Sequence, residues 1–129
     1  MHILLVEDDE VDAEVVARVL RREKIGNPFF LARDGVEAMN LLNSDSCPQL
    51  PCLVLMDINM PRMDGFQLLA EMRKQEGFKD NVVYMLTTSS RDQDKQKAES
   101  MNAAGYITKE NIGALVDVLR RHCKPEDEN

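Results

Sequence analysis

The sequence has few cysteines and no long hydrophobic run, and both shortages limit what the protein can be. Its three cysteines, Cys47, Cys52 and Cys123, are odd in number and lack the spacing of metal ligands. We therefore expect reduced thiols and a cytoplasmic protein. No apolar stretch approaches the ~20 residues of a membrane-spanning helix. Met1 leads directly into a strand-like segment, so we expect no signal peptide and no membrane association.

Positive charge is also scarce. The 16 Lys and Arg residues are outnumbered by 23 Asp and Glu residues, which gives a formal net charge of −7. A protein that binds nucleic acid through its own field needs clustered Lys and Arg. The densest basic run is Arg120, Arg121 and His122, which fits one exposed turn of a helix. The sequence therefore predicts no nucleic-acid partner.

The remaining composition is typical of a globular domain. Hydrophobic residues make up 43% and charged residues 30% of the 129 positions. This length allows one domain with its own core. We assign residues 1–123 to that domain and expect the charged segment 124–129, which contains Pro125, to be a disordered tail. The eight methionines are interpreted as core-filling side chains rather than as a ligand groove.

Short apolar runs alternate along the chain with segments of helical periodicity. Several runs are continuous, which is typical of strands that are covered on both faces. The runs are residues 3–6, 29–32, 53–56, 82–86 and 106–108. They predict five strands.

The segments between the strands predict five helices. In the last one, Ile112, Leu115, Val116 and Leu119 have the spacing of a single apolar face. Residues 15–20 and 66–72 carry similar stripes, residues 36–42 form a short segment, and residues 90–103 are almost wholly polar. Five strand–helix repeats predict an α/β fold of the flavodoxin-like, doubly wound type, with a five-stranded parallel sheet of order 2-1-3-4-5 and helices on both faces.

Polar residues follow four of these predicted strands, at the edge where ligands bind in such sheets. They are Glu7, Asp8, Asp9, Asp57, Thr87, Thr88 and Lys109. In the order 2-1-3-4-5 the four strands are neighbours, so we expect these side chains to converge. Two unit charges ~5 Å apart repel by about 3 kcal/mol at an effective dielectric of ~20, so the carboxylates need a cation beyond one lysine. An all-oxygen site with two or three carboxylates suits Mg²⁺.

Such a site can carry out phosphoryl transfer. A carboxylate can act as a nucleophile and become an acyl phosphate. The reaction requires mainly positioning and neutralisation of the charge on the phosphoryl oxygens. Glu7, Asp8 and Asp57 could hold the metal, while Lys109 supplies an ammonium and Thr87 a hydroxyl.

Several of the polar residues also have ordinary structural interpretations. Asp9 is expected to cap the first helix rather than to bind metal. Asp34 and Asp64, each followed by glycine, are expected in turns or caps. Residues 87–90 could cap the fourth helix, and Lys109 taken alone would be a solvated lysine. Asp57, directly after a buried strand, is harder to explain without a function.

Four sequence blocks resemble the receiver domains of bacterial response regulators. They are LVEDD at 5–9, LMDINMPRMDG at 55–65, LTT at 86–88 and GYITK at 105–109. The blocks occur in the order of the family and span essentially the whole chain, and the one around Asp57 is highly specific. LTTS together with YITK is more similar to the stand-alone receivers associated with phytochrome-type kinases.

The resemblance implies that Asp57 is the phosphoacceptor, phosphorylated by a sensor histidine kinase or a histidine phosphotransfer protein. Asp8 would bind Mg²⁺ directly, Glu7 through a metal-bound water, and Asn59 through its backbone carbonyl. Such a protein is chiefly a signalling phosphoacceptor, although it catalyses its own aspartyl phosphorylation and dephosphorylation.

The resemblance also implies a switch. Thr87 and Lys109 would bind the phosphoryl oxygens, and the rotamer of Tyr106 would follow the movement of Thr87. We expect no output domain after the receiver. The signal would then pass to a downstream protein target, or into a homodimer, through the face formed by the fourth helix, the fifth strand and the fifth helix.

One position departs from the family, because Lys109 is followed by Glu110 where members usually carry proline. The Lys-Pro bond of relatives is commonly cis, but a cis bond before a non-proline residue costs ~2.5–4 kcal/mol. We therefore expect a trans bond and a fifth helix that starts near Asn111, with Lys109 still reaching Asp57.

Three alternatives remain at this point. A pseudo-receiver would keep the fold as a constitutive protein-binding module, which the departure at Glu110 leaves open. A phosphatase of the haloacid dehalogenase type needs Asp-x-Asp after its first strand, and here Asp57 follows the third. A flavodoxin needs a phosphate cradle rich in Ser, Thr and Gly after the first strand, where this chain is acidic.

Overall fold

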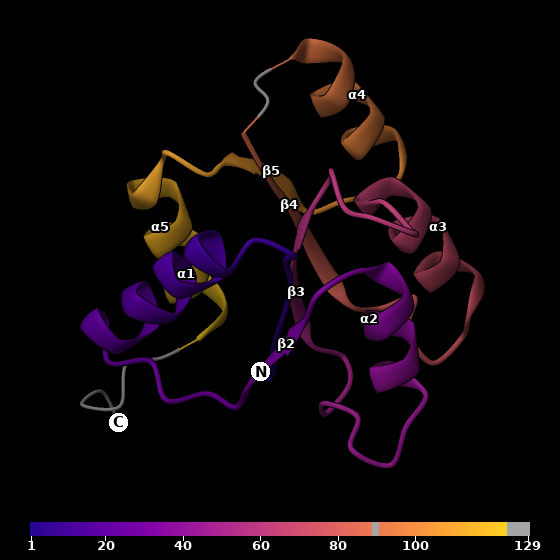
Figure 1. Ribbon diagram of the computed structural model, residues 1–129, viewed down its shortest axis with the longest axis horizontal. Coiled ribbons are helices and arrows are strands. Elements are labelled where there is room, and N and C mark those ends of the chain that lie inside the picture. Colours follow the sequence, from indigo (N-terminus) through magenta and orange to yellow (C-terminus); the bar gives the residue numbers. More distant parts are fainter. Residues whose placement is uncertain (89–90, 124–129) are drawn as a thin grey trace.

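The computed structural model describes residues 1–88 and 91–123, which form a five-stranded sheet and five helices (Figure 1). The elements are β1 (Ile3–Val6), α1 (Glu10–Arg22), β2 (Phe29–Ala32), α2 (Gly35–Leu42), β3 (Leu53–Asp57), α3 (Gly65–Lys74), β4 (Val82–Thr87), α4 (Asp92–Ser100), β5 (Gly105–Thr108) and α5 (Ile112–His122). All strand pairs are parallel, in the order β2-β1-β3-β4-β5. The predicted fold is confirmed.

Two helical layers cover the sheet, as Figure 1 shows: α1 and α5 lie on one face, and α2, α3 and α4 on the other. In β1, Leu4 and Val6 pack toward α2 and α3, whereas Ile3 and Leu5 pack toward α1 and α5. All four side chains are fully buried. The apolar runs are continuous because both faces of the central strands are covered.

The strands match their predicted ranges closely. β1 and β2 agree residue for residue, and the other three are longer by one residue each, so that Asp57 ends β3 and Thr87 ends β4. α4 is shorter than the predicted segment 90–103, because a polar helix that buries only Ala98 has little packing to extend it. Its N-cap position is Arg91, without a side-chain cap bond, so Thr87 does not cap this helix. Ser89, Ser90 and the predicted tail 124–129 lie outside the described residues.

Three aspartates cap helices, as predicted. Asp9 accepts hydrogen bonds from the backbone N–H groups of Val11 and Asp12, at 2.8 and 3.1 Å. Asp34 accepts one from the N–H of Glu37 at 2.8 Å. Asp64 forms a reciprocal capping box with the residue three positions on. Since these caps follow β1, β2 and β3 directly or after a short loop, α1, α2 and α3 all begin near the carboxyl edge of the sheet.

Three smaller predictions can also be compared with the structure. Among the described residues the one cis peptide bond precedes Pro51, so the bond between Lys109 and Glu110 is trans, as expected. α5 begins at Ile112 with Asn111 as its N-cap. The three cysteines are free thiols. Within the described ranges, no helix has the length and hydrophobicity needed to cross a bilayer.

The basic run near the carboxyl end forms the last turn of α5. Arg120 is exposed and pairs with Glu23, which follows α1, at 2.7 Å. The run therefore lies at the C-terminal end of α5, away from the carboxyl edge of the sheet, as one turn of a surface helix.

Candidate functional site

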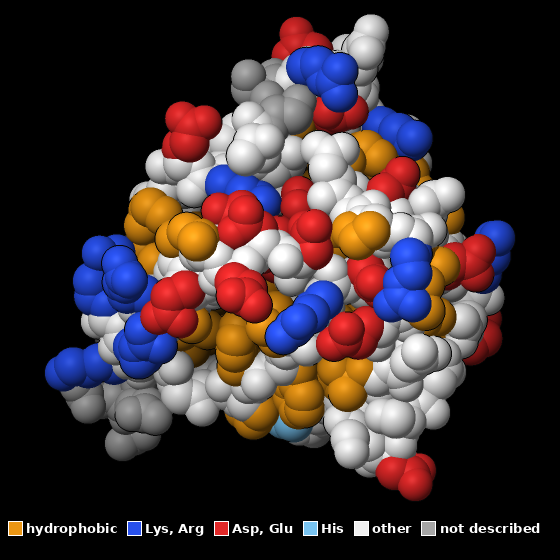
Figure 2. All heavy atoms as spheres, viewed as in Figure 1, with side chains coloured by type: hydrophobic (Ala, Val, Ile, Leu, Met, Phe, Trp, Pro, Cys, Tyr) orange, Lys and Arg blue, Asp and Glu red, His pale blue; other side chains and the backbone are white. Residues whose placement is uncertain are grey.

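Three carboxylates meet at the carboxyl edge of the sheet. β1 and β3 are neighbours with Val6 level with Met56, so Glu7 and Asp57 continue from paired positions. Oxygen atoms of Glu7, Asp8 and Asp57 all lie within 4.8 Å of one another. Glu7 and Asp57 are buried, whereas Asp8 is exposed. Figure 2 shows acidic side chains gathered where β3 ends and α1 begins.

Lys109 lies among these acids. Its Nζ atom is 2.6 Å from Glu7 Oε1, 2.7 Å from Asp12 Oδ2 and 3.3 Å from Asp57 Oδ2. The side chain is only 12% exposed, and the backbone N–H of Lys109 donates to the carbonyl of Thr87 at 2.7 Å. The bond after Lys109 is trans and the Lys109 side chain still reaches Asp57, as predicted.

The side chain of Lys109 stays protonated in this site. Burial acts to lower its pKa, but hydrogen bonds to Asp12 and Glu7 and the charges of Asp57 and Glu7 outweigh burial and raise the pKa above its ordinary value. An ammonium with a raised pKa stays protonated throughout the physiological range. The site therefore keeps one permanent positive charge beside Asp57.

Burial disfavours the charged form of Glu7. Burial raises the pKa of Glu7 to about 7; the hydrogen bond from Lys109 opposes this, and the charge of Asp57 adds to it. Glu7 Oε2 accepts from the N–H of Asp9 at 3.2 Å. Glu7 Oε1 is buried, and its neighbour is the Lys109 ammonium at 2.6 Å.

This donor set fits a hard divalent cation. All the candidate ligand atoms are oxygens, and two of the three carboxylates are buried. Mg²⁺ prefers such oxygen ligands and is commonly held by one or two carboxylates with waters. A cation here would offset a carboxylate repulsion that Lys109 alone leaves uncompensated.

Asn59, Thr87 and Tyr106 are the other predicted site residues. The backbone N–H of Asn59 donates to Asp57 Oδ1 at 3.3 Å, so its peptide lies beside the candidate phosphoacceptor. Thr87 is fully buried at the end of β4, next to β3. Tyr106 lies on β5 level with Met85, is half-buried, and packs against the core on the α2–α4 side. The roles assigned to these three residues stay predictions.

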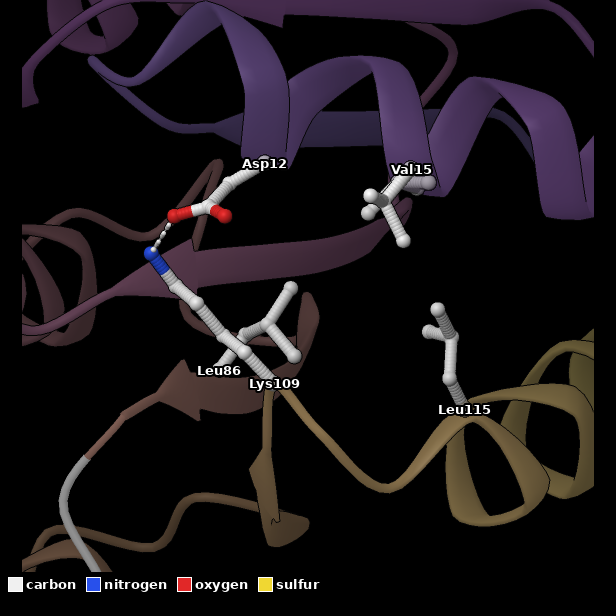
Figure 3. A pocket seen from close by; sticks show the side chains of 6 residues that line it. Asp12, Val15, Leu86, Lys109 and Leu115 are labelled. Atoms are coloured by element: carbon white, nitrogen blue, oxygen red, sulfur yellow. Dashed lines mark hydrogen bonds and ion pairs between the residues drawn. The ribbon is translucent and has the colours of Figure 1, made fainter.

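Asp12 was not predicted as a site residue. It lies in the first turn of α1, and its Oδ2 atom accepts a hydrogen bond from Lys109 Nζ at 2.7 Å, as Figure 3 shows. The two side chains border a small cavity of about 40 Å³ between α1 and α5. A signal was present in the sequence: Asp12 is three and four positions before Val15 and Val16, on the stripe of α1 that faces the core. An acid there needs a partner.

Comparison with known proteins decides the family. The sequence model of the response regulator receiver domain matches residues 3–120. The chain belongs to the response regulator receiver domain family. It is a phosphoacceptor module of two-component signalling, a class that interacts with histidine kinases or other phosphodonors.

Receivers related to phytochromes are among the most similar proteins. Over 111 residues the chain is 35% identical to response regulator Rcp1 from Synechocystis sp., which covers 83% of this chain and 75% of Rcp1. The crystal structure of Mn²⁺-bound Rcp1 matches with a TM-score of 0.79 at 31% identity, over 92% of this chain and 90% of that one. The phosphorylated cyanobacterial phytochrome response regulator RcpA gives a TM-score of 0.77 at 28% identity, over 94% and 91%.

Proposed function

We propose that Asp57 accepts a phosphoryl group from a histidine kinase or a histidine phosphotransfer protein, in a reaction that depends on Mg²⁺. The observation that carries this proposal is the convergence of Glu7, Asp8 and Asp57 with Lys109 at the end of β3. A carboxylate oxygen of Asp57 forms a bond to phosphorus while the bond from phosphorus to the donor imidazole nitrogen breaks. The electron pair stays on that nitrogen, and the product is an acyl phosphate.

The surrounding residues position the reactants and neutralise charge. Lys109 directs its ammonium at the phosphoryl oxygens, and Thr87 donates its hydroxyl to them. Glu7, Asp8, Asp57 and the carbonyl of Asn59 would hold Mg²⁺, with Glu7 acting through a bound water, and the ion would supply positive charge to the phosphoryl group. The Mn²⁺ in the structure of the relative Rcp1 supports a divalent cation in this class of site.

The signal leaves through the face formed by α4, β5 and α5, toward a downstream protein target or a second copy of the chain. Thr87 on β4 and Tyr106 on the neighbouring β5 link the site to this face. A groove of about 320 Å³ between α4 and β5, lined by Lys95, Ala98 and Tyr106 among others, offers a binding surface. Amide hydrogen exchange that changes with phosphorylation only in the loop after β3 would contradict this route.

Labelling with acetyl phosphate and Mg²⁺ tests the phosphoacceptor. Intact-protein mass spectrometry should show the mass of one added phosphoryl group, which is absent in Asp57→Asn and in a sample with excess chelator. An Asp57→Asn variant that is labelled as well as wild type would refute the assignment. A folded wild-type protein that takes no label from any phosphodonor would instead point to a pseudo-receiver that binds proteins constitutively.

A further inference from the structure

The loop between β3 and α3, residues 58–64, is attached to the start of α2 at two points. Arg62 donates from both Nε and Nη2 to Asp34 Oδ2, at 2.9 and 2.7 Å. Next to this pair, a Cβ atom on Gly35 would come within 2.7 Å of the Met63 side chain, so Met63 lies directly against the glycine. The loop is therefore docked on a helix that belongs to a different part of the sequence.

Asp34 is well suited to anchor the loop. It is 6% exposed, and each of its oxygens has a partner: Oδ1 accepts from the N–H of Glu37 and Oδ2 from Arg62. The backbone N–H of Glu37, together with Arg62, holds the pKa of the Asp34 carboxyl below its ordinary value. A buried carboxylate that also caps a helix has little freedom to move, so it fixes the position of Arg62.

The loop needs such an anchor, because its own backbone does not favour the observed path. Arg62 has a φ of 65°, in the left-handed region. For a residue other than glycine this conformation costs roughly 1–2 kcal/mol. The loop also bonds to itself and to α3, through Met63 N–H to Pro61 at 2.7 Å and Gly65 N–H to Ile58 at 2.9 Å. These short-range bonds set its shape but do not place it against the rest of the molecule.

The loop carries Asn59, a candidate metal ligand, so its position matters for metal binding. Asn59 is three residues before Arg62, and its N–H contacts Asp57 Oδ1. Its carbonyl is the one ligand in the proposed metal site that comes from the backbone. A backbone ligand is positioned only as well as the loop that bears it.

We propose that Arg62 and Asp34 form a clamp that positions the β3–α3 loop for metal binding, and thereby for phosphorylation of Asp57; the inference rests on the function proposed above. Both are positioning residues, which act through Asn59 and touch no reacting atom. Breaking the clamp should raise the Kd for Mg²⁺ by about tenfold, as is usual when a group that orients a metal ligand is removed.

The sign of this change separates positioning from simple electrostatics. Arg62 is a cation, and removing a cation near an acidic cluster by itself strengthens the binding of Mg²⁺. The clamp predicts the opposite for Arg62→Gln, namely weaker binding. Asp34→Asn is the companion variant, because asparagine still caps α2 but loses the charge that holds Arg62.

Arg21→Gln is a matched control. Arg21 pairs with Glu14 at the same 2.7 Å as Arg62 with Asp34, and the two arginine side chains are 64% and 60% exposed. The difference is the partner: the side chain of Glu14 is 53% exposed and that of Asp34 only 8%. Both variants remove the same charge from the surface, but only Arg62→Gln releases the loop.

The experiment measures the Mg²⁺ Kd by calorimetry, amide exchange in residues 58–64 and the Tm, for wild type, Arg62→Gln, Asp34→Asn, the double variant and Arg21→Gln. We expect weaker Mg²⁺ binding and faster loop exchange in both single clamp variants, little further loss in the double variant, and wild-type behaviour in Arg21→Gln. An unchanged or tighter Kd in Arg62→Gln, even with a lowered Tm, overturns the clamp. Failure of the wild-type protein to accept a phosphoryl group would contradict the proposed function but not the clamp, because Mg²⁺ affinity and amide exchange are measured without phosphorylation.

Discussion

Gly65→Ala is the substitution whose effect the structure defines most closely. Gly65 is the first residue of α3, and an added Cβ would collide with the carbonyl oxygen of Asp57. It would also lie 2.9 Å from Met85 Cε and 3.0 Å from Ile58 Cα. The glycine is therefore required by the close approach of α3 to the end of β3, and the residue it touches is the candidate phosphoacceptor.

The expected loss of folding stability depends on which atoms obstruct the new methyl group. Overpacking a core usually costs ~1–3 kcal/mol, because side chains turn aside. Two of the three obstructing atoms here belong to the backbone and cannot turn aside, so we expect a loss at the upper end, about 3 kcal/mol. In a domain of this size that corresponds to a fall in Tm of about 10 °C. The rate of phosphorylation should fall by about 100-fold, since a shift near 1 Å at a reacting group has effects of this order.

Gly77→Ala provides the control, because no atom lies within 4 Å of a Cβ added there. Thermal unfolding and the initial rate of labelling by acetyl phosphate should be compared for the two variants and wild type. Gly77→Ala should match wild type in both. If Gly65→Ala unfolds within about 2 °C of wild type, a change equivalent to well under 1 kcal/mol, and is labelled at the same rate, then α3 tolerates a side chain at this position and glycine is not required there.

Two further predictions concern aspartates near the site. Asp8→Ala should abolish measurable Mg²⁺ binding. Asp9→Ala should keep most of the Mg²⁺ binding but lose about 1 kcal/mol of folding stability, because it removes the cap of α1. Equal losses of Mg²⁺ binding in the two variants would contradict this assignment. The pKa of Asp34 is lowered by the N–H of Glu37 and by Arg62. The ionised carboxylate of Asp34 therefore stabilises the fold fully above the unfolded-state pKa, ~3.9, and this stabilisation is lost as the pH falls through the lower folded-state pKa. The difference in Tm between wild type and Asp34→Asn should consequently shrink below about pH 4.

The strands could be predicted nearly to the residue because the sheet is covered on both faces. Val54 and Leu55 on β3 are adjacent in sequence and face opposite layers, and both are fully buried. A continuous apolar run is the direct consequence. α4 was harder, since its composition gives no apolar stripe and its N-terminus has no side-chain cap. Where packing and capping are both weak, the sequence contains little information about where a helix begins.

The convergence of the site residues was also predictable, and the contacts between them were not. Parallel strands bring their carboxyl ends to one edge, so Asp57 and Lys109 had to lie close together once the strand order was known. The contacts of Asp34 with Arg62 depend instead on how α2 is rotated and how the β3–α3 loop is folded. Such details are set by tertiary packing, for which the spacing of residues in the sequence gives no rule.

Asp12 changes the balance of charge that the sequence implied. The Lys109 ammonium, with its three N–H donors, lies within 3.3 Å of carboxylate oxygens of Glu7, Asp12 and Asp57, and the carboxylate of Asp8 is close to those of Glu7 and Asp57. A phosphoryl group on Asp57 must take at least one donor. The side chain of Asp12 is 35% exposed, against 1% for Glu7, so water can replace Lys109 at Asp12 with the least loss. We therefore expect phosphorylation to break the contact between Lys109 and Asp12, and a structure with a phosphoryl mimic in which Lys109 still donates to Asp12 would contradict this ordering.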